Sequence, residues 1–152
     1  MGDIVRINHS FGGLPEKYKY NGWLQVPRGE YLATLETWVT FKFMTSPRIA
    51  LIFNIIDTGE NFGKHIPAFF GVKRHRGKTR EKGEFIAAPR GDLMAFFYTL
   101  NPESPKVPHF RIPLSKLNKV YSIKVGDVTN NRNQKKHPNQ LIYSRVIDAK
   151  PA

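Results

Sequence analysis

The sequence predicts a mainly β protein built around five antiparallel strands, with one helix between the third and the fourth. Three observations predict it. Apolar and polar residues alternate in the early part of the chain. Near the middle, apolar residues recur at spacings of three and four, and near the end the alternation returns. The 152 residues suffice for a single domain with one hydrophobic core.

The first regular element follows an irregular start. Residues 1–28 are rich in Gly, Pro, Asn and Lys, and we expect an N-terminal arm there with one short strand near residues 22–26. In Tyr31–Phe43 the odd positions are mostly apolar and the even ones polar, apart from Leu32 and Trp38, which predicts a strand. A strand this long bends and can bridge two halves of a small barrel. We therefore divide the chain into an arm, 1–28, and a domain, 29–152.

Two more strands are predicted next, joined by short turns. Thr45–Arg48 has the composition of a turn, and the β-branched run Ile49–Ile56 predicts a strand buried on both faces. A second turn covers Asp57–Gly63, and Lys64–Arg74 is the third strand. Consecutive strands with short connections favour an antiparallel meander.

A helix interrupts the strands. Apolar residues recur at spacings of three and four from Leu93 to Leu100, which predicts a helix with Asp92 as its cap. Prolines keep residues 101–113 irregular, and a short helical turn is expected within residues 112–117.

Alternation returns in Val120–Val128 and in Gln140–Ala149, which a polar stretch over residues 129–139 connects. The element order is then that of an OB-like five-stranded Greek-key barrel. Such barrels bind oligonucleotides on strands two and three and with the loops between strands one and two and strands four and five. Here those loops are Thr45–Arg48 and Asn130–Asn139.

The charge of the chain is concentrated in its second part. The net charge is +12, and because residues 1–60 hold six Lys or Arg and six Asp or Glu, the whole excess lies in residues 61–152. The densest stretch, Lys73–Gly83, carries six cations and one carboxylate. This asymmetry indicates a basic face for an anionic partner, with nucleic acid ahead of a membrane surface. A solvated loop that only aids solubility is the alternative.

Single-stranded nucleic acid is bound by cations that follow the backbone and by flat side chains on which bases stack. We expect the cations on a flexible loop after the third strand, on the loop before the last strand, and at the first turn. The candidate phosphate contacts are Arg48, Lys73, Arg74, Arg76, Lys78, Arg80, Lys82, Arg132, Lys135 and Lys136. The candidate stacking residues are Trp38, Phe69, Phe70 and Tyr143, with Tyr20 and Trp23 of the arm as further candidates.

Each aromatic candidate has a competing structural interpretation, because aromatic side chains dominate core burial. The residues expected in the core outright are Phe41, Phe43, Phe53, Phe96 and Phe97. Trp38 lies on the otherwise polar face of its strand, and the adjacent Phe69 and Phe70 point to opposite faces. Both roles stay open for Trp38 and for one of the two phenylalanines.

No motif for catalysis or metal binding stands out. The histidines are dispersed, the carboxylates are few, and Gly77-Lys78-Thr79 lacks the upstream glycine of a phosphate loop. The absence of cysteine excludes a disulfide scaffold and a thiol nucleophile, and it suits a reducing cytoplasm. We expect no enzymatic activity, no metal and no cofactor. Arg90-Gly91-Asp92 spells an integrin-recognition tripeptide, which we interpret as a coincidence because helix capping accounts for Asp92.

An ordered series of short motifs runs through the predicted domain: Gly29-Glu30-Tyr31, Pro47-Arg48 leading into Leu51–Ile55, Phe62-Gly63-Lys64, and Tyr143–Ile147. In these motifs the chain resembles small uncharacterised proteins of bacterial plasmids, integrative conjugative elements and phages. It is also distantly similar to phage proteins suspected of binding single-stranded DNA. The resemblance covers residues 29–149 and implies a mobile-element protein with an OB-like barrel.

The predicted function is sequence-nonspecific nucleic-acid binding in mobile-element or phage DNA metabolism, by a basic groove with aromatic stacking. Single-stranded DNA is favoured over duplex DNA or RNA, and a homo-oligomer is left open. The alternative is a mobile-element interaction module that binds an acidic protein, such as an inhibitor of a host factor. Without a signal-like start or a long apolar run, we expect a cytoplasmic protein with no membrane partner.

Overall fold

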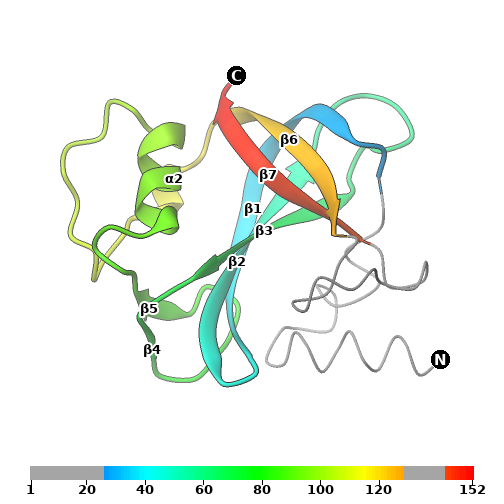
Figure 1. The fold of residues 1–152 in the computed structure, drawn as a ribbon. Helices are drawn as coiled ribbons and strands as arrows, with labels where there is room; N and C mark the ends of the chain where they lie inside the picture. The colour runs from blue at the N-terminus through cyan, green and yellow to red at the C-terminus, as the bar shows by residue number, and fades with distance from the viewer. Residues whose placement is uncertain (1–25, 129–142) are drawn as a thin grey trace.

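A computed structural model describes residues 26–128 and 143–152 of the chain. Five strands form one antiparallel sheet in the order β3-β2-β1-β6-β7 (Figure 1). These strands are β1 (Gly29–Phe43), β2 (Ser46–Ile55), β3 (His65–Gly71), β6 (Val120–Val128) and β7 (Tyr143–Pro151). Between β3 and β6 lie the paired strands β4 (Arg74–Arg76) and β5 (Glu84–Ile86), then α2 (Asp92–Leu100) and the 3-10 helix η3 (Leu114–Lys116). The predicted mainly β fold, with one helix between the third and fourth strands of its sheet, is confirmed.

Strand β1 has two different neighbours along one of its edges. One edge pairs with β2, up to the turn at Phe43. The other edge pairs with β6 only over Gly29–Thr34. Farther along the same strand, Val39 lies opposite Glu81 in an isolated bridge. The long strand therefore joins two parts of the fold, which is the role its length predicts.

A β-bulge between Leu35 and Thr37 changes which residues of β1 face the main core: odd-numbered residues before it and even-numbered residues after it. Before the bulge, Leu35 lies opposite Phe53; after it, Trp38 lies opposite Leu51. Phe53 and Leu51 both belong to the main core, so Leu35 and Trp38 share the core face. Strict alternation places Trp38 on the polar face, and that prediction is wrong because the bulge inserts one residue.

Strand β2 is buried on both faces, as its sequence predicts. Every side chain from Ile49 to Phe53 has 0% exposure. Ile49, Leu51 and Phe53 belong to the main core cluster, whereas Ala50 and Ile52 alternate to the other face of the sheet.

Helix α2 packs on the core beside the sheet edges. Its buried side chains are Leu93, Met94, Phe97 and Leu100. The helix contacts both β3 and β7, and Figure 1 shows it beside the sheet. The predicted helix over residues 93–100 is therefore confirmed, starting one residue earlier.

Asp92 does not cap this helix. The N-cap residue is Gly91, with φ −86° and ψ 174°, and no side-chain bond caps the helix. Asp92 is instead the first helical residue, where the positive end of the helix dipole favours a carboxylate.

The first turn and the third strand are both shorter than predicted. Ser46–Arg48 belongs to β2, so the turn consists of Met44 and Thr45, with φ values of 48° and 72°. Positive φ at both positions is the geometry of a type I′ hairpin, whose twist matches its strands. Strand β3 ends at Gly71 rather than at Arg74, because Arg74 already begins β4.

Strands β3 and β7 are the two edges of the sheet. Their Cα atoms approach within 8 Å, but among the described residues no ladder of hydrogen bonds joins them. The sheet is therefore not closed by strand pairing.

The remaining predictions concern the ends of the chain. Strand β6 has the predicted bounds, and η3 lies within the predicted helical turn. The last strand is described from Tyr143 to Pro151, and residues 140–142 of its predicted range lie outside the described residues. Residues 1–25, most of the predicted arm, lie outside the described residues, whereas Val26 is buried in the core. No helix formed by the described residues is long and apolar enough to cross a membrane.

Candidate nucleic-acid interface

The basic segment forms a hairpin held by hydrogen bonds, where the sequence predicts a flexible loop. Lys73–Ile86, called the basic hairpin from here on, contains β4 and β5, which pair from Arg74 opposite Ile86 to Arg76 opposite Glu84. The Lys73 N–H also donates to the Ile86 carbonyl at 2.8 Å. Arg74 and Arg76 therefore lie in a paired strand, and Lys78, Arg80 and Lys82 lie in the connection that the two strands close.

Backbone hydrogen bonds attach the basic hairpin to β1. The Thr40 N–H donates to the Arg80 carbonyl at 3.0 Å, and the Lys82 N–H donates to the Trp38 carbonyl at 2.7 Å. This edge of β1 is open to the hairpin because β6 pairs only with residues 29–34. Beyond the residues that pair with β6, the hairpin thus bonds to the same edge of β1 over a short distance.

Polar side chains of β1 complete the attachment. The Trp38 indole N–H donates to the Gly83 carbonyl at 3.1 Å. The Thr40 hydroxyl, which is fully buried, accepts the Arg80 N–H at 2.9 Å and donates to the Arg80 carbonyl at 3.1 Å. A Cβ added to Gly83 would lie 2.2 Å from the Thr40 hydroxyl oxygen, so this approach requires glycine.

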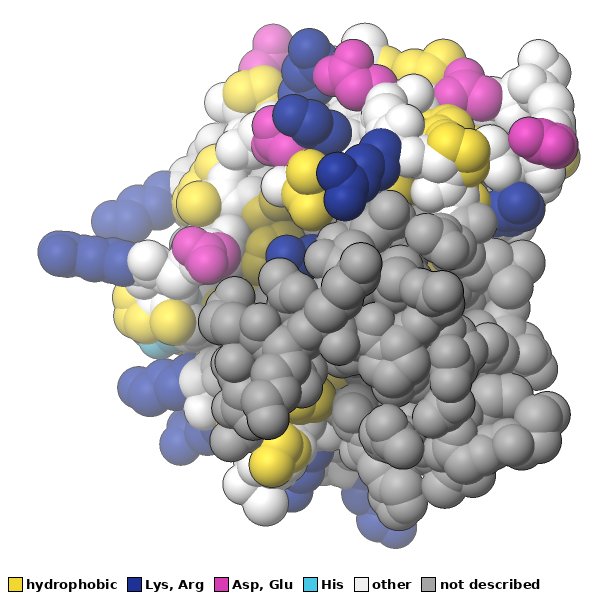
Figure 2. Space-filling model, turned by 45° about the vertical axis from the view of Figure 1, so that its right-hand side comes forward, with side chains coloured by type: hydrophobic (Ala, Val, Ile, Leu, Met, Phe, Trp, Pro, Cys, Tyr) yellow, Lys and Arg dark blue, Asp and Glu magenta, His cyan; other side chains and the backbone are white. Residues whose placement is uncertain are grey.

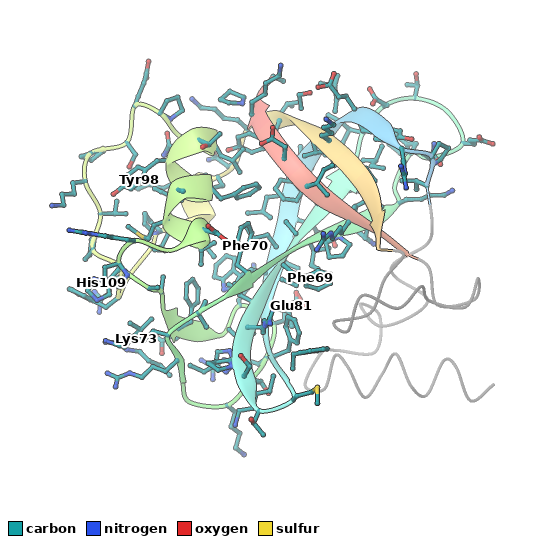
Figure 3. All side chains as sticks on the ribbon, viewed as in Figure 1. Phe69, Phe70, Lys73, Glu81, Tyr98 and His109 are labelled. Carbon is teal, nitrogen blue, oxygen red and sulfur yellow. The ribbon has the colours of Figure 1, made fainter. Side chains whose placement is uncertain are left out.

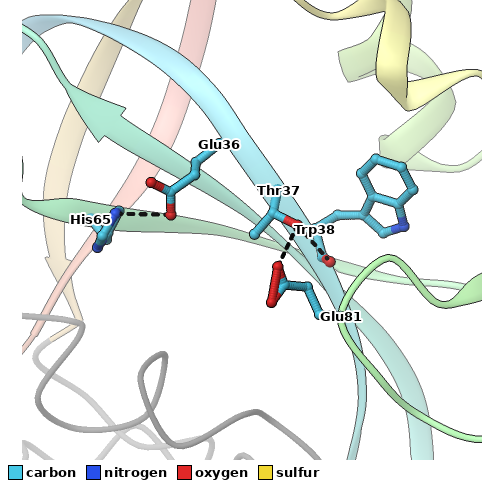
Figure 4. A network of polar contacts seen from close by, with 5 residues as sticks. All are labelled: Glu36, Thr37, Trp38, His65 and Glu81. Atoms are coloured by element: carbon cyan, nitrogen blue, oxygen red, sulfur yellow. Dashed lines mark hydrogen bonds and ion pairs between the residues drawn. The ribbon is translucent and has the colours of Figure 1, made fainter.

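A further polar network surrounds the bulge of β1 (Figure 4). The Thr37 hydroxyl donates to the Glu81 carboxylate, with 3.3 Å between the two oxygens. Glu36 and His65 form a pair with 3.0 Å between carboxylate oxygen and ring nitrogen. The network ties one of the two hairpin carboxylates, Glu81, to the sheet.

His75 fixes β4 to the start of β2. Its Nε2 lies 2.8 Å from the Arg48 carbonyl oxygen, which can only accept, so Nε2 is the donor. Arg74 and Arg76 flank His75, and alternation directs them to the opposite face of β4. The Arg48 guanidinium lies 5.4 Å from the centroid of the Phe43 ring, within range for a cation–π interaction.

The cations of the basic hairpin are free to meet a ligand. All six are exposed, and none forms an ion pair with a carboxylate of the described residues: Lys73, Arg74, Arg76, Lys78, Arg80 and Lys82. Figure 2 shows Lys and Arg side chains projecting along one side of the molecule, and in Figure 3 Lys73 points away from the body. Like charges gathered this way create a positive potential that attracts polyanions.

Three of the predicted stacking residues, Trp38, Phe69 and Phe70, are half-buried and make packing contacts. Trp38 packs against the core and contacts the hairpin. Phe70 packs against Phe96 with 4.9 Å between ring centroids, while Phe69 meets Phe41 edge-on at 5.9 Å (Figure 3). The core cluster includes Phe70 among its neighbours but not Phe69, in keeping with the predicted opposite directions.

The expected core aromatics are placed as follows. Phe41, Phe53 and Phe97 are buried, with at most 1% exposure, and Phe96 packs on the core half-buried. Phe43 is half-buried near the Arg48 guanidinium.

The rest of the predicted site cannot be placed. Arg132, Lys135 and Lys136 lie outside the described residues, as do Tyr20 and Trp23. Tyr143 begins β7, but its side chain is also outside the described part.

The structure adds residues that the sequence reasoning missed. Phe110 is 46% exposed, meets His109 edge-on at 5.6 Å between ring centroids, and precedes the exposed Arg111. An aromatic residue between basic residues in a proline-rich segment was the available signal. His109, which precedes Phe110, lines a hollow of about 600 Å³ between α2 and residues 106–109.

In residues 26–128 and 143–152 no three His, Asp or Glu side chains gather where they could hold a metal ion. No protein-family model matches the chain, and neither a curated protein nor a solved structure is similar enough to it to match.

Proposed function

We propose that the protein binds nucleic acid without sequence specificity, single-stranded DNA in preference to duplex DNA or RNA, through the basic hairpin. One observation carries the proposal: six exposed cations on a hydrogen-bonded hairpin, none of them paired with a described carboxylate. Each cation that neutralises a phosphate also releases a counterion, which drives binding at low salt. We assign these cations to phosphates, which carry no sequence information, and therefore expect binding without sequence preference.

The strand arrangement supports an OB-like barrel as the scaffold. The order β3-β2-β1-β6-β7 is compatible with that fold, and the edges β3 and β7 approach each other. Barrels of this kind bind single strands beside the turn between their first two strands. The bond from His75 to the Arg48 carbonyl attaches the basic hairpin close to that turn.

Stacking is the second part of the proposal. Trp38 is half-buried, and its indole borders Gly83 of the hairpin. A base placed on its accessible part would lie beside the phosphate contacts. Phe69, Phe70 and Tyr143 remain the other stacking candidates. A role in mobile-element or phage DNA metabolism rests on the motif resemblance alone.

A salt titration tests the proposal. The affinity of the full chain for a fluorescent oligothymidylate is measured by anisotropy at several salt concentrations. We expect tight binding at low salt that weakens steeply as salt is added. The variant Arg74→Ala/Arg76→Ala/Lys78→Ala should reduce the slope of log K against log salt by about 2, since each lost single-strand contact removes about 0.7.

The matched control removes three exposed lysines elsewhere on the fold, Lys116→Ala/Lys124→Ala/Lys150→Ala. A smaller slope change in the control supports a localised contact. Equal changes would indicate attraction by net charge only, and no binding at low salt would reject the proposal. Duplex DNA, RNA and polyglutamate compete in the same assay. Binding to polyglutamate in the absence of oligonucleotide binding would point to the acidic-protein alternative.

A further inference from the structure

A second basic surface lies next to the basic hairpin. It surrounds the hollow between α2 and the segment before η3, with a volume of about 600 Å³. Its lining includes the exposed Arg90 and Lys106 and the half-buried His109, and no carboxylate lines it. This volume is within the range of small-ligand sites in proteins.

The walls of the hollow are apolar and aromatic. Met94 and Tyr98 of α2 form one side, and Val107 forms part of the other. The Tyr98 hydroxyl accepts the Val107 N–H at 2.9 Å, which fixes the ring against the opposite segment. A surface that combines flat or apolar walls with cations suits a nucleotide, whose base is planar and whose phosphate is anionic.

The hollow and the basic hairpin are joined through the backbone. Lys73 bonds to Ile86, and the next residue, Ala87, donates its N–H to the His109 carbonyl at 2.9 Å. Figure 3 shows Lys73 and His109 on the same side of the molecule. The segment that carries His109 is therefore attached to the residue that directly follows the basic hairpin.

We infer that the hollow is a subsite for one nucleotide of the strand that the basic hairpin holds. Arg90 and Lys106 contact the phosphate, and the base stacks within the hollow against Tyr98 or His109. Phe110, beside His109 at the rim, offers a surface for the neighbouring base. The inference rests on the proposed function and extends its site beyond the hairpin.

Photo-crosslinking of the full chain tests the subsite. Oligothymidylates with a single 5-iododeoxyuridine at successive positions are bound at low salt and irradiated, and crosslinked peptides are mapped by mass spectrometry. We expect crosslinks at Tyr98, His109 or Phe110 for a limited set of positions. Phe110→Ala, at an exposed residue, should remove its own crosslink and leave the fold intact.

The salt dependence of binding gives a second readout. The slope of log K against log salt is negative, and Arg90→Ala/Lys106→Ala should reduce its magnitude by about 1.4, since each of the two lost contacts removes about 0.7. Lys124→Ala/Lys150→Ala, at exposed lysines of β6 and β7 that do not line the hollow, is the control. The subsite is overturned if the chain binds the oligonucleotide but crosslinks form only elsewhere, and if the double variant loses no more slope magnitude than the control. That outcome leaves the proposed function standing. No oligonucleotide binding at all rejects the proposed function and the subsite with it.

Discussion

The two halves of β1 belong to one strand but hold their neighbours by different interactions. Residues 29–34 join β6 in a regular ladder, and the side chains involved, such as Ala33 opposite Tyr121, lie in the core. Residues 38–40 join the basic hairpin through few backbone bonds, with the Trp38 indole and the Thr40 hydroxyl completing the contact.

The first half of β1 therefore stabilises the domain, whereas the second half positions the basic hairpin. Apolar burial in the first half is non-directional and tolerates exchange of one apolar side chain for another of similar volume. The second half depends on particular donors and acceptors, since a buried polar group that loses its partner is costly. Changes in the first half should therefore unfold the domain, and changes in the second should release the hairpin.

The largest effect is expected in the first half, from Tyr121→Ala. Tyr121 is 1% exposed and its ring meets Phe53 in the core, so truncation leaves a cavity. We expect the free energy of unfolding to fall by about 3–5 kcal/mol, measured by urea denaturation. Tyr121→Phe keeps the ring and is the control. Equal losses in the two variants would contradict the cavity explanation.

The next effect is expected from Gly83→Ala in the second half. The new Cβ would lie 2.2 Å from the Thr40 hydroxyl oxygen and 3.1 Å from the Arg80 carbonyl, so the hairpin must shift. We expect a loss of about 1–3 kcal/mol, with faster hydrogen exchange confined to the hairpin and its contacts on β1. Gly71→Ala has open space for the Cβ and serves as control. Faster exchange throughout β6 would show that the two halves are not separable.

A smaller effect is expected from Thr40→Val, which keeps the shape but removes the hydroxyl. The Arg80 N–H and carbonyl each lose a partner, although the backbone bond from Thr40 to Arg80 remains. We expect a loss of about 1 kcal/mol. Thr40→Ser retains the hydroxyl and should preserve the protection of the Arg80 amide from exchange. If Val and Ser behave alike, the hydroxyl does not hold the hairpin.

The smallest effect is expected at alkaline pH and belongs to the first half. Burial, followed by the nearby Asp57 and Glu60 carboxylates, raises the pKa of Tyr31 above 10.0. The folded state then keeps a proton that the unfolded state releases, so stability is full below pH 10 and falls as pH rises through the raised pKa. Tyr31→Phe should lessen this fall, measured by urea denaturation at pH 8 and at about pH 10.5. Burial also raises the pKa of Tyr121, so part of the fall should persist.

Much of the fold could be predicted, because periodicity records burial. The run Ile49–Ile56 and the apolar stripe of α2 both indicate their burial directly. The bulge after Leu35 leaves no such mark, since inserting one residue looks the same as an ordinary polar position. Short strands are also hard to predict, and the three residues of β4 fall at the end of the predicted third strand and in the predicted loop.

The sequence predicts which cations belong to the candidate site, but it does not predict the tertiary contacts that hold them. Six cations in one segment identify the hairpin from sequence alone. The bond from Trp38 to Gly83 joins residues far apart in the chain, and no local pattern announces it. The exposure of Phe110 likewise depends on tertiary packing, because an aromatic residue near prolines is as compatible with burial as with exposure.

The bulge of β1 also determines how this domain tolerates changes of length. Removing Glu36 would remove the bulge and restore simple alternation along β1. If Thr37–Phe43 kept their pairing with β2, the side chains of residues 29–35 would turn to the opposite face of the sheet. If the first half held its pairing instead, Trp38 and Thr40 would turn away from Gly83 and Arg80. A single-residue deletion here thus sets the two halves out of phase, which no substitution does. Homologous chains should accept gaps in the turns and keep the spacing between Leu35 and Trp38 fixed.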